Sequence, residues 1–343
     1  MAPWLELPFH IEKVTPEEEK LVRKCLIGYS RPFVRCGKHG YLMPGAFEKH
    51  AEHIYNLQVR PDDVWVITFP RSGTTWTQEL VWLVENNLDF ETARSKPLYE
   101  RFPMVEITSK IPDLAFELIK MNFLNLRSFQ GLNEAVRVPS WKSVDNAPSP
   151  RFIKTHLPLS LLPPKLLDTA KVIYVARDPR DVAVSYYYFY KMVAKGLFRT
   201  SLKTFWDAFR KDLLPWTPVV AHTIEAWQQR NHPNLHFLFY EDLIQDLPKE
   251  ILRMCKFMNR EYSEEQMKQL ADYLSFESLR KNKNVNNSTD KTVQFIRNGK
   301  IGSWKTHFDQ KMLIQAEEYL ISRLQGSDLA YPTFSTEDEC SRL

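Results

Sequence analysis

Residues 64–80 read V-W-V-I-T-F-P-R-S-G-T-T-W-T-Q-E-L, and this stretch decides the fold. Its apolar run at 64–69 predicts a buried strand, and the residues from Ser72 onward predict a helix. The turn between them supplies Arg71 as a fixed charge and Gly73, which lets the backbone approach a ligand. Because the first N–H groups of a helix have no partners within it, this turn predicts a phosphate or sulfate site.

The turn is P-loop-like, but it is not a Walker A loop. The pattern G-x-x-x-x-G-K-[ST] is missing, because the stretch has neither its first glycine nor its lysine. This argues against a P-loop kinase. For this stretch alone, an ordinary strand–turn–helix connection with an incidental arginine remains an alternative.

Composition narrows the class of protein. The chain has 343 residues, of which 43% are apolar and 26% charged, as in soluble globular proteins. Its net charge of +4 includes no dense Lys/Arg run, so we expect no nucleic-acid partner. No membrane span or signal pattern is found, which favours a cytoplasmic protein. The four cysteines lack C-x-x-C spacing, so neither a disulfide framework nor a zinc site is indicated.

A second motif, R-F-I-K-T-H-L-P at residues 151–158, predicts another strand. Lys154 and His156 would lie at its carboxyl end, where open α/β sheets bind ligands. With an ordinary pKa of about 6.5, a neutral His156 could take a proton from an acceptor hydroxyl. Lys154 could offset charge on a bridging oxygen. A purely structural role for His156 remains an alternative.

A third strand–turn–helix pattern follows at residues 171–190. K-V-I-Y-V-A predicts the strand, and Asp178 is a suitable N-cap for the helix after it. Arg177 then lies at the carboxyl end of the strand, and Ser185 lies on the same helix face as Asp178. A capped helix with a solvated arginine remains an alternative.

Strands alternate with helices along the chain, which predicts the α/β class: one domain, residues 1–343, with a central parallel sheet flanked by helices. Residues 1–56 are expected to form an irregular leader with helices near Pro16–Cys25 and at 47–57. Residues 89–150 are expected to be a lid or insertion over an acceptor pocket, with an apolar helical run at 114–126. The glycine-rich loop at 295–304 could fold over an anion.

Five motifs in this order resemble the cytosolic sulfotransferases, most closely the insect members that include retinol dehydratase-like proteins. They are T-F-P-R-S-G-T-T-W, F-I-K-T-H-L-P, Y-V-A-R-D-P-R-D-V-A-V-S-Y-Y, F-L-F-Y-E-D and R-N-G-K-I-G-S-W. The resemblance runs from about residue 57 onward. Members of this family transfer a sulfuryl group from 3′-phosphoadenosine 5′-phosphosulfate (PAPS) to a hydroxyl or amine of a small apolar acceptor.

The resemblance implies roles for the matching residues. His156 would be the catalytic base, Lys154 would stabilise the transferring group, and Arg71 would act with them on the leaving phosphate. The implied nucleotide site consists of Arg71, Ser72, Gly73, Thr74, Thr75, Trp76, Arg177, Ser185, Tyr240, Ser275, Phe276, Arg297 and Gly299. No metal is expected, because a sulfuryl group carries less negative charge than a phosphoryl group and side-chain cations can replace Mg²⁺.

Some residues depart from the family pattern. Arg71 and Asn298 stand where the family usually has lysine, and the short dimer motif is poorly kept, which predicts a monomer or a weak homodimer. The main hypothesis is sulfation of a small apolar alcohol or phenol, as in xenobiotic or hormone metabolism. Two alternatives stay open: sulfation-coupled dehydration of an allylic alcohol such as a retinoid, and a catalytically weak nucleotide-binding relative.

Overall fold

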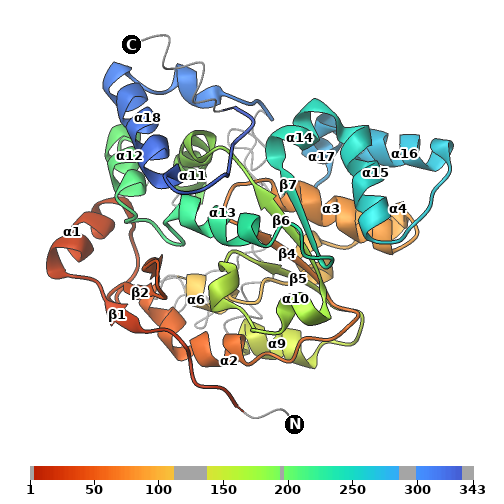
Figure 1. Cartoon of the computed structure of the whole chain (residues 1–343), viewed down its shortest axis with the longest axis horizontal. Coiled ribbons are helices and arrows are strands. Elements are labelled where there is room, and N and C mark those ends of the chain that lie inside the picture. Colours follow the sequence, from red (N-terminus) through yellow and green to blue (C-terminus); the bar gives the residue numbers. More distant parts are fainter. Residues whose placement is uncertain (1–3, 112–136, 194–196, 286–298, 334–343) are drawn as a thin grey trace.

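A four-stranded parallel sheet lies at the centre of the molecule, in the order β5-β4-β6-β7 (Figure 1). The computed structural model describes residues 4–111, 137–193, 197–285 and 299–333. The sheet and its flanking helices confirm the predicted α/β class. The strands of this sheet are β4 (Val64–Thr68), β5 (Phe152–Thr155), β6 (Lys171–Ala176) and β7 (Leu235–Phe239).

Helices cover both faces of the sheet (Figure 1). Most are short, and the longest described ones are α11, α18 and α3. Their bounds are η1 (Gly45–Lys49), α1 (Pro16–Cys25), α2 (Ala51–Tyr55), α3 (Thr74–Glu85), α4 (Phe90–Ser95), α5 (Leu98–Arg101), α6 (Ile107–Lys110), α9 (Ser140–Asn146), η3 (Leu159–Leu161), α10 (Leu166–Thr169), α11 (Pro179–Val193), α12 (Leu202–Arg210), α13 (Val219–Gln228), α14 (Tyr240–Gln245), α15 (Leu247–Phe257), α16 (Glu264–Leu274), α17 (Phe276–Lys281), η4 (Ser303–Thr306) and α18 (Gln310–Leu324).

The central strands are apolar on both faces because each face contacts a separate core. Trp65 and Ile67 of β4 point into a core shared with α11, α12, α13 and α18. Val66, between them, points into a second core with α3, α15 and α16. Successive side chains of a strand alternate between its faces, so a strand buried on both sides is a continuous apolar run. This explains why the apolar run at residues 64–69 predicted a buried strand.

The amino-terminal segment is more regular than predicted. Three short strands form an antiparallel sheet in the order β1-β2-β3, with bounds β1 (Ile11–Lys13), β2 (Val34–Cys36) and β3 (Tyr41–Met43). The predicted first helix is confirmed as α1, and Thr15 begins it with a capping box. The second prediction, at 47–57, corresponds to η1 followed by α2. Strands of three residues are too short to show alternation, so the sequence did not reveal them.

Residues 103–105, which belong to the segment predicted as a lid, pair with the edge of β5. Lys154 N–H donates to the Pro103 carbonyl at 2.9 Å, and Val105 N–H donates to the Lys154 carbonyl at 3.0 Å. This pairing brings α6 to the carboxyl edge of the sheet, next to His156. The predicted helical run at 114–126 lies outside the described residues, so its role as a lid stays a prediction.

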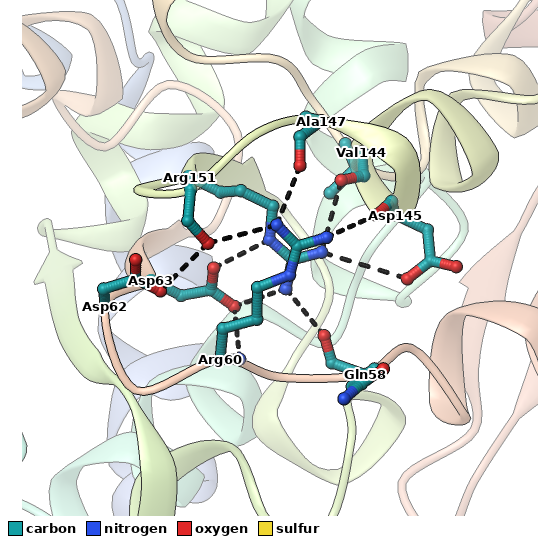
Figure 2. A network of polar contacts seen from close by, with 9 residues as sticks. Gln58, Arg60, Asp62, Asp63, Val144, Asp145, Ala147 and Arg151 are labelled. Carbon is teal, nitrogen blue, oxygen red and sulfur yellow. Dashed lines mark hydrogen bonds and ion pairs between the residues drawn. The ribbon is translucent and has the colours of Figure 1, made fainter. Parts of the chain in front are cut away.

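A cluster of ions and carbonyls joins the opposite, amino-terminal ends of β4 and β5 (Figure 2). The Arg151 guanidinium donates from Nε to Asp63 Oδ1 at 2.7 Å and is 1% exposed. It also donates to the carbonyls of Gln58 and Val144. Arg60 donates to two further carbonyls of the 144–147 segment. Removing one partner of a buried ion pair typically costs about 3–5 kcal/mol, so this cluster fixes the end of the sheet that is remote from the ligand edge.

Within the described residues, no helix is both long and apolar enough to cross a membrane.

Candidate active site

The turn after β4 presents backbone N–H groups at the start of α3. Gly73 precedes the helix with φ of 101°, and Arg71 has φ of 72°. A Cβ added at Gly73 would lie 2.6 Å from the Tyr240 ring, so the close approach itself requires glycine. The N–H groups of Thr74 and Thr75 start the helix and have no intrahelical acceptor. The turn is therefore suited to bind an anion.

Two arginines converge on this turn. Arg71 donates from Nε to Ser185 Oγ at 3.1 Å, and Arg177 donates to the Arg71 carbonyl at 3.0 Å. The Arg177 guanidinium lies 4.2 Å from the centroid of the Tyr240 ring. Its buried Nε has no hydrogen-bond partner among the described residues. An unpaired donor on a buried cation is costly unless a ligand supplies the acceptor, so Arg177 fits an anionic ligand.

His156 lies at the carboxyl end of β5 with its ring orientation fixed. Nδ1 is 2.8 Å from the Thr68 carbonyl oxygen, which can only accept, so Nδ1 carries the proton and donates it. Nε2 is then left with its lone pair. The His222 ring nitrogen Nε2 lies 3.0 Å from the His156 carbonyl and donates to it, while Tyr174 holds the other His222 nitrogen. The imidazole is therefore held as a neutral base.

Glu106 holds the backbone beneath His156. Its carboxylate accepts from the His156 N–H at 2.7 Å and from Thr155 Oγ1 at 2.9 Å. Burial raises the pKa of Glu106, although these hydrogen bonds and Lys154 act in the opposite direction. No motif in the sequence pointed to Glu106. It positions the carboxyl end of β5 by pairing two donors that would otherwise be buried without an acceptor.

Burial and mutual repulsion shift the pKa values of the basic groups. Desolvation, followed by the charges of Lys154 and Lys110, lowers the pKa of His156 well below its usual value. Desolvation also lowers the pKa of Lys154 to about 8 and that of Lys110 to about 7. Each shift has the sign expected when a cation is buried near other cations. Neutral His156 is thus available throughout the physiological pH range.

The basic groups Lys110, Lys154 and His156 line one cavity of about 250 Å³. Most of the predicted site residues line it, and Ser72, Ser275 and Arg297 are the exceptions. Ser72 is buried without lining the cavity, Ser275 instead accepts from Ser278 N–H as the N-cap of α17, and Arg297 lies outside the described residues. The predicted residues that do line it are Arg71, Gly73, Thr74, Thr75, Trp76, Lys154, His156, Arg177, Ser185, Tyr240, Phe276 and Gly299.

The cavity is also lined by residues outside the predicted site, of which the sequence analysis missed Met104, Ile107 and Lys110. Met104, Ile107 and Lys110 come from the segment beside β5, and Phe189 comes from α11. The pairing of residues 103–105 with β5, which brings the first three here, cannot be read from local spacing. Phe189 belongs to the aromatic run at 186–190, of which Tyr186 is buried in the core. Lys300 also lines the cavity and belongs to the glycine-rich loop at 295–304, which the sequence predicted to fold over an anion.

Asp181 of α11 anchors the glycine-rich loop. Its carboxylate accepts from Gly302 N–H at 2.7 Å, from Ser303 Oγ at 2.8 Å and from Trp304 N–H at 3.2 Å. The same loop carries Gly299 against the Phe276 ring, where an added Cβ would lie 2.5 Å from ring carbons. One carboxylate therefore fixes the position of a loop that lines the cavity.

Replacing Asp181 with alanine should weaken the binding of 3′-phosphoadenosine 5′-phosphate (PAP), the desulfated form of PAPS, by up to about a hundredfold, because the loop loses three hydrogen bonds worth about 1 kcal/mol each. Titration calorimetry measures this directly. Asp309→Ala is the control, since Asp309 caps α18 and does not line the cavity. Equal affinities for wild type and Asp181→Ala would show that the loop does not contribute to nucleotide binding.

Among the described residues, no group of three or more His, Cys, Asp or Glu side chains is arranged to hold a metal ion.

A family model described as a sulfotransferase domain matches residues 61–328. The chain belongs to the sulfotransferase family. Human Sulfotransferase 1E1 is 31% identical over 303 residues, covering 86% of this chain and 95% of that protein. The luciferin sulfotransferase of Photinus pyralis is 30% identical over 325 residues, covering 90% of this chain and 84% of that one.

Solved structures extend this similarity to the fold. A retinol dehydratase crystallised with retinol and PAP matches with a TM-score of 0.88 and 38% identity, over 96% of this chain and 100% of that one. The same figures hold for a retinol dehydratase complex with androsterone and PAP. The predicted membership of the sulfotransferase family is confirmed, and this sulfotransferase is an enzyme of the transferase class.

Proposed function

We propose that this sulfotransferase transfers the sulfuryl group of PAPS to the hydroxyl of a small apolar alcohol or phenol, with His156 as the general base. The observation that carries the proposal is the single cavity in which the N–H groups of α3, the cations Arg71 and Lys154, and the neutral His156 imidazole meet. The PAP complexes of the similar retinol dehydratase structures support PAPS as the donor.

The residues of the cavity fit such a donor. The α3 N–H groups and Arg71 would hold its 5′-phosphosulfate, and Arg177 would supply its unpaired Nε to a phosphate oxygen. Trp76 and Phe276 line the cavity as aromatic surfaces for a purine ring. Bound PAPS supplies an activated sulfuryl group on an oxygen of the 5′-phosphate.

In the proposed reaction, His156 Nε2 accepts the proton of the acceptor hydroxyl. The acceptor oxygen forms a bond to sulfur, and the bond from sulfur to the phosphate oxygen breaks with its electron pair remaining on the phosphate. Lys154 and Arg71 offset the charge that develops on that oxygen. Arg71 can do so only as a fixed cation, because a guanidinium does not release a proton at working pH.

A second candidate is sulfation followed by loss of sulfate, which dehydrates an allylic alcohol. It is favoured by the 38% identity, over 96% of this chain, to a retinol dehydratase crystallised with retinol. In this route the carbon–oxygen bond of the sulfate ester breaks, sulfate leaves with the electron pair, and a proton is lost from carbon. Product mass distinguishes the routes, because one product gains a sulfuryl group and the other loses water.

Calorimetric titration of PAP in the presence of a chelator tests the donor site. Arg177→Ala should weaken binding by about tenfold to a hundredfold, since a hydrogen bond to a charged group is worth about 1.5–3 kcal/mol. Arg230→Ala is the matched control, because Arg230 pairs with Asp328 away from the cavity. Equal weakening by both variants would contradict the assignment. Tight binding without turnover on a broad acceptor panel would instead favour a catalytically weak relative.

The cytoplasmic location, the monomer or weak homodimer, and the single-domain boundaries at 1–343 stay predictions.

A further inference from the structure

Lys110 is a cation that the proposed donor chemistry leaves unused. It ends α6, and its carbonyl accepts from Tyr29 Oη at 3.1 Å. The helix itself is tied down by Ser140, which donates to the Val105 carbonyl at 2.6 Å and exchanges further hydrogen bonds with Thr108. The backbone of Lys110 is therefore anchored, and its side chain lines the cavity beside His156 and Lys154.

Two aromatic rings hold the Lys110 ammonium group. Its Nζ lies 5.2 Å from the centroid of Phe189 and 5.2 Å from that of Trp216. The electron-rich face of an aromatic ring attracts a cation at this distance. The Trp216 ring also packs edge-on against the His156 ring, with centroids 5.9 Å apart. Lys110 and the base thus contact the same indole, which places Lys110 on the His156 side of the cavity.

The part of the chain that the structure describes offers Lys110 no counterion. Among the described residues, no carboxylate lies within ion-pair distance of its Nζ. Glu106 is the acidic residue that acts on it, and both oxygens of that carboxylate are already paired with the strand end at Thr155 and His156. Burial and the charge of Lys154 lower the pKa of Lys110 to about 7. Below that pH Lys110 is a buried cation with no counterion among the described residues, and an electron-rich oxygen in the cavity would be attracted to it.

We propose that Lys110 is a specificity-determining residue: its ammonium group binds the reacting oxygen of the acceptor and selects acidic hydroxyls, so that phenols are preferred over aliphatic alcohols. This rests on the proposed sulfuryl transfer. A cation beside the oxygen stabilises the partly ionised hydroxyl, and a phenol ionises far more readily than an alcohol. The phenol proton passes to His156 Nε2, the oxygen–sulfur bond forms, and the phosphate keeps the electron pair of the bond that breaks.

The test uses two isomers, para-ethylphenol and para-methylbenzyl alcohol, which have nearly equal apolar areas and hydroxyls of different acidity. With saturating PAPS, Lys110→Met should lower kcat/KM for the phenol by about tenfold, equivalent to about 1.4 kcal/mol, and for the alcohol by less than about twofold. Lys110→Arg should restore most of the preference. Lys171→Met is the matched control, because Lys171 also lies over an aromatic ring, 4.7 Å from Phe257, but does not line the cavity.

Equal losses on the two isomers would overturn the proposal, and so would a weaker affinity of Lys110→Met for PAP, since that would assign Lys110 to the donor. Lys110→Gln replaces Lys110→Met if the latter does not fold. If wild type binds PAP but sulfates neither isomer, the proposed function fails. Calorimetric titration of the two isomers into the PAP complex then shows whether the site still prefers the phenol. A phenol preference that Lys110→Met abolishes supports the proposal, and the absence of a preference overturns it.

Discussion

Replacing His156 with alanine should lower kcat by about 10²–10⁴-fold while leaving the affinity for PAP nearly unchanged. The imidazole is oriented for one task, since Nδ1 donates to the Thr68 carbonyl and Nε2 retains its lone pair. Burial and nearby cations lower its pKa well below the usual value, so the neutral form persists as pH falls through about 6.5. The activity of the wild type should therefore show no acid limb in that region.

Steady-state kinetics measures the effect of His156→Ala on kcat, and titration calorimetry measures its effect on the affinity for PAP. The matched control is His236→Ala, because His236 is a half-buried histidine of β7 that does not line the cavity. Normal turnover by His156→Ala would remove His156 from the mechanism. A loss of PAP affinity equal to the loss of turnover would show that the ring supports the donor site instead.

Replacing Lys154 with methionine should lower kcat by about 10²–10³-fold, the usual cost of removing one group that stabilises developing charge. The wild type should also show an alkaline limb in kcat/KM. Desolvation lowers the pKa of Lys154 to about 8, so its cation is present below that pH and is lost as pH rises through it. Glu106 opposes this shift and Arg71 adds to it.

The pH profile of kcat/KM checks the second prediction, because that ratio reports the free enzyme. Lys154→Met should lose the limb near pH 8, whereas the control Lys171→Met, at the start of β6, should keep it. Burial lowers the pKa of Lys110 to about 7, so with the phenol as acceptor Lys110 should contribute a separate limb, which Lys110→Met should remove. An unchanged profile in Lys154→Met would assign the alkaline limb to another group.

The sequence predicted the central sheet well because its strands have clear apolar patterns. β4 and β6 are apolar on both faces, and each is followed by a turn with distinctive chemistry at Arg71 or Arg177. Local patterns therefore identified the strands, and the rule that ligands bind at their carboxyl ends gathered the side chains into one site. The antiparallel sheet near residue 11 was missed because alternation needs more than three residues.

The rest of the site depends on contacts between segments that are distant in sequence. Lys110 reaches the cavity, and Glu106 reaches the end of β5 beneath His156, because residues 103–105 add to the edge of β5, and nothing in their local sequence encodes that pairing. Ser275 was predicted to belong to the nucleotide site and does not line the cavity. A serine is equally suited to cap a helix, and here it caps α17. Arg297 lies outside the described residues, so its role stays a prediction.

The Arg151–Asp63 cluster (Figure 2) lies far from the ligand edge, so we expect opening of the loops at that edge to be independent of separation of the strands. It joins β4 and β5 at their amino ends, whereas the turn at Gly73 and the loop held by Asp181 lie at the carboxyl ends of the sheet. Local opening can therefore release a nucleotide without separating the strands. The free energy of that opening is a different quantity from the free energy of unfolding. Natural variation at the ligand edge can thus change the residence time of a nucleotide while the cooperativity of unfolding stays the same.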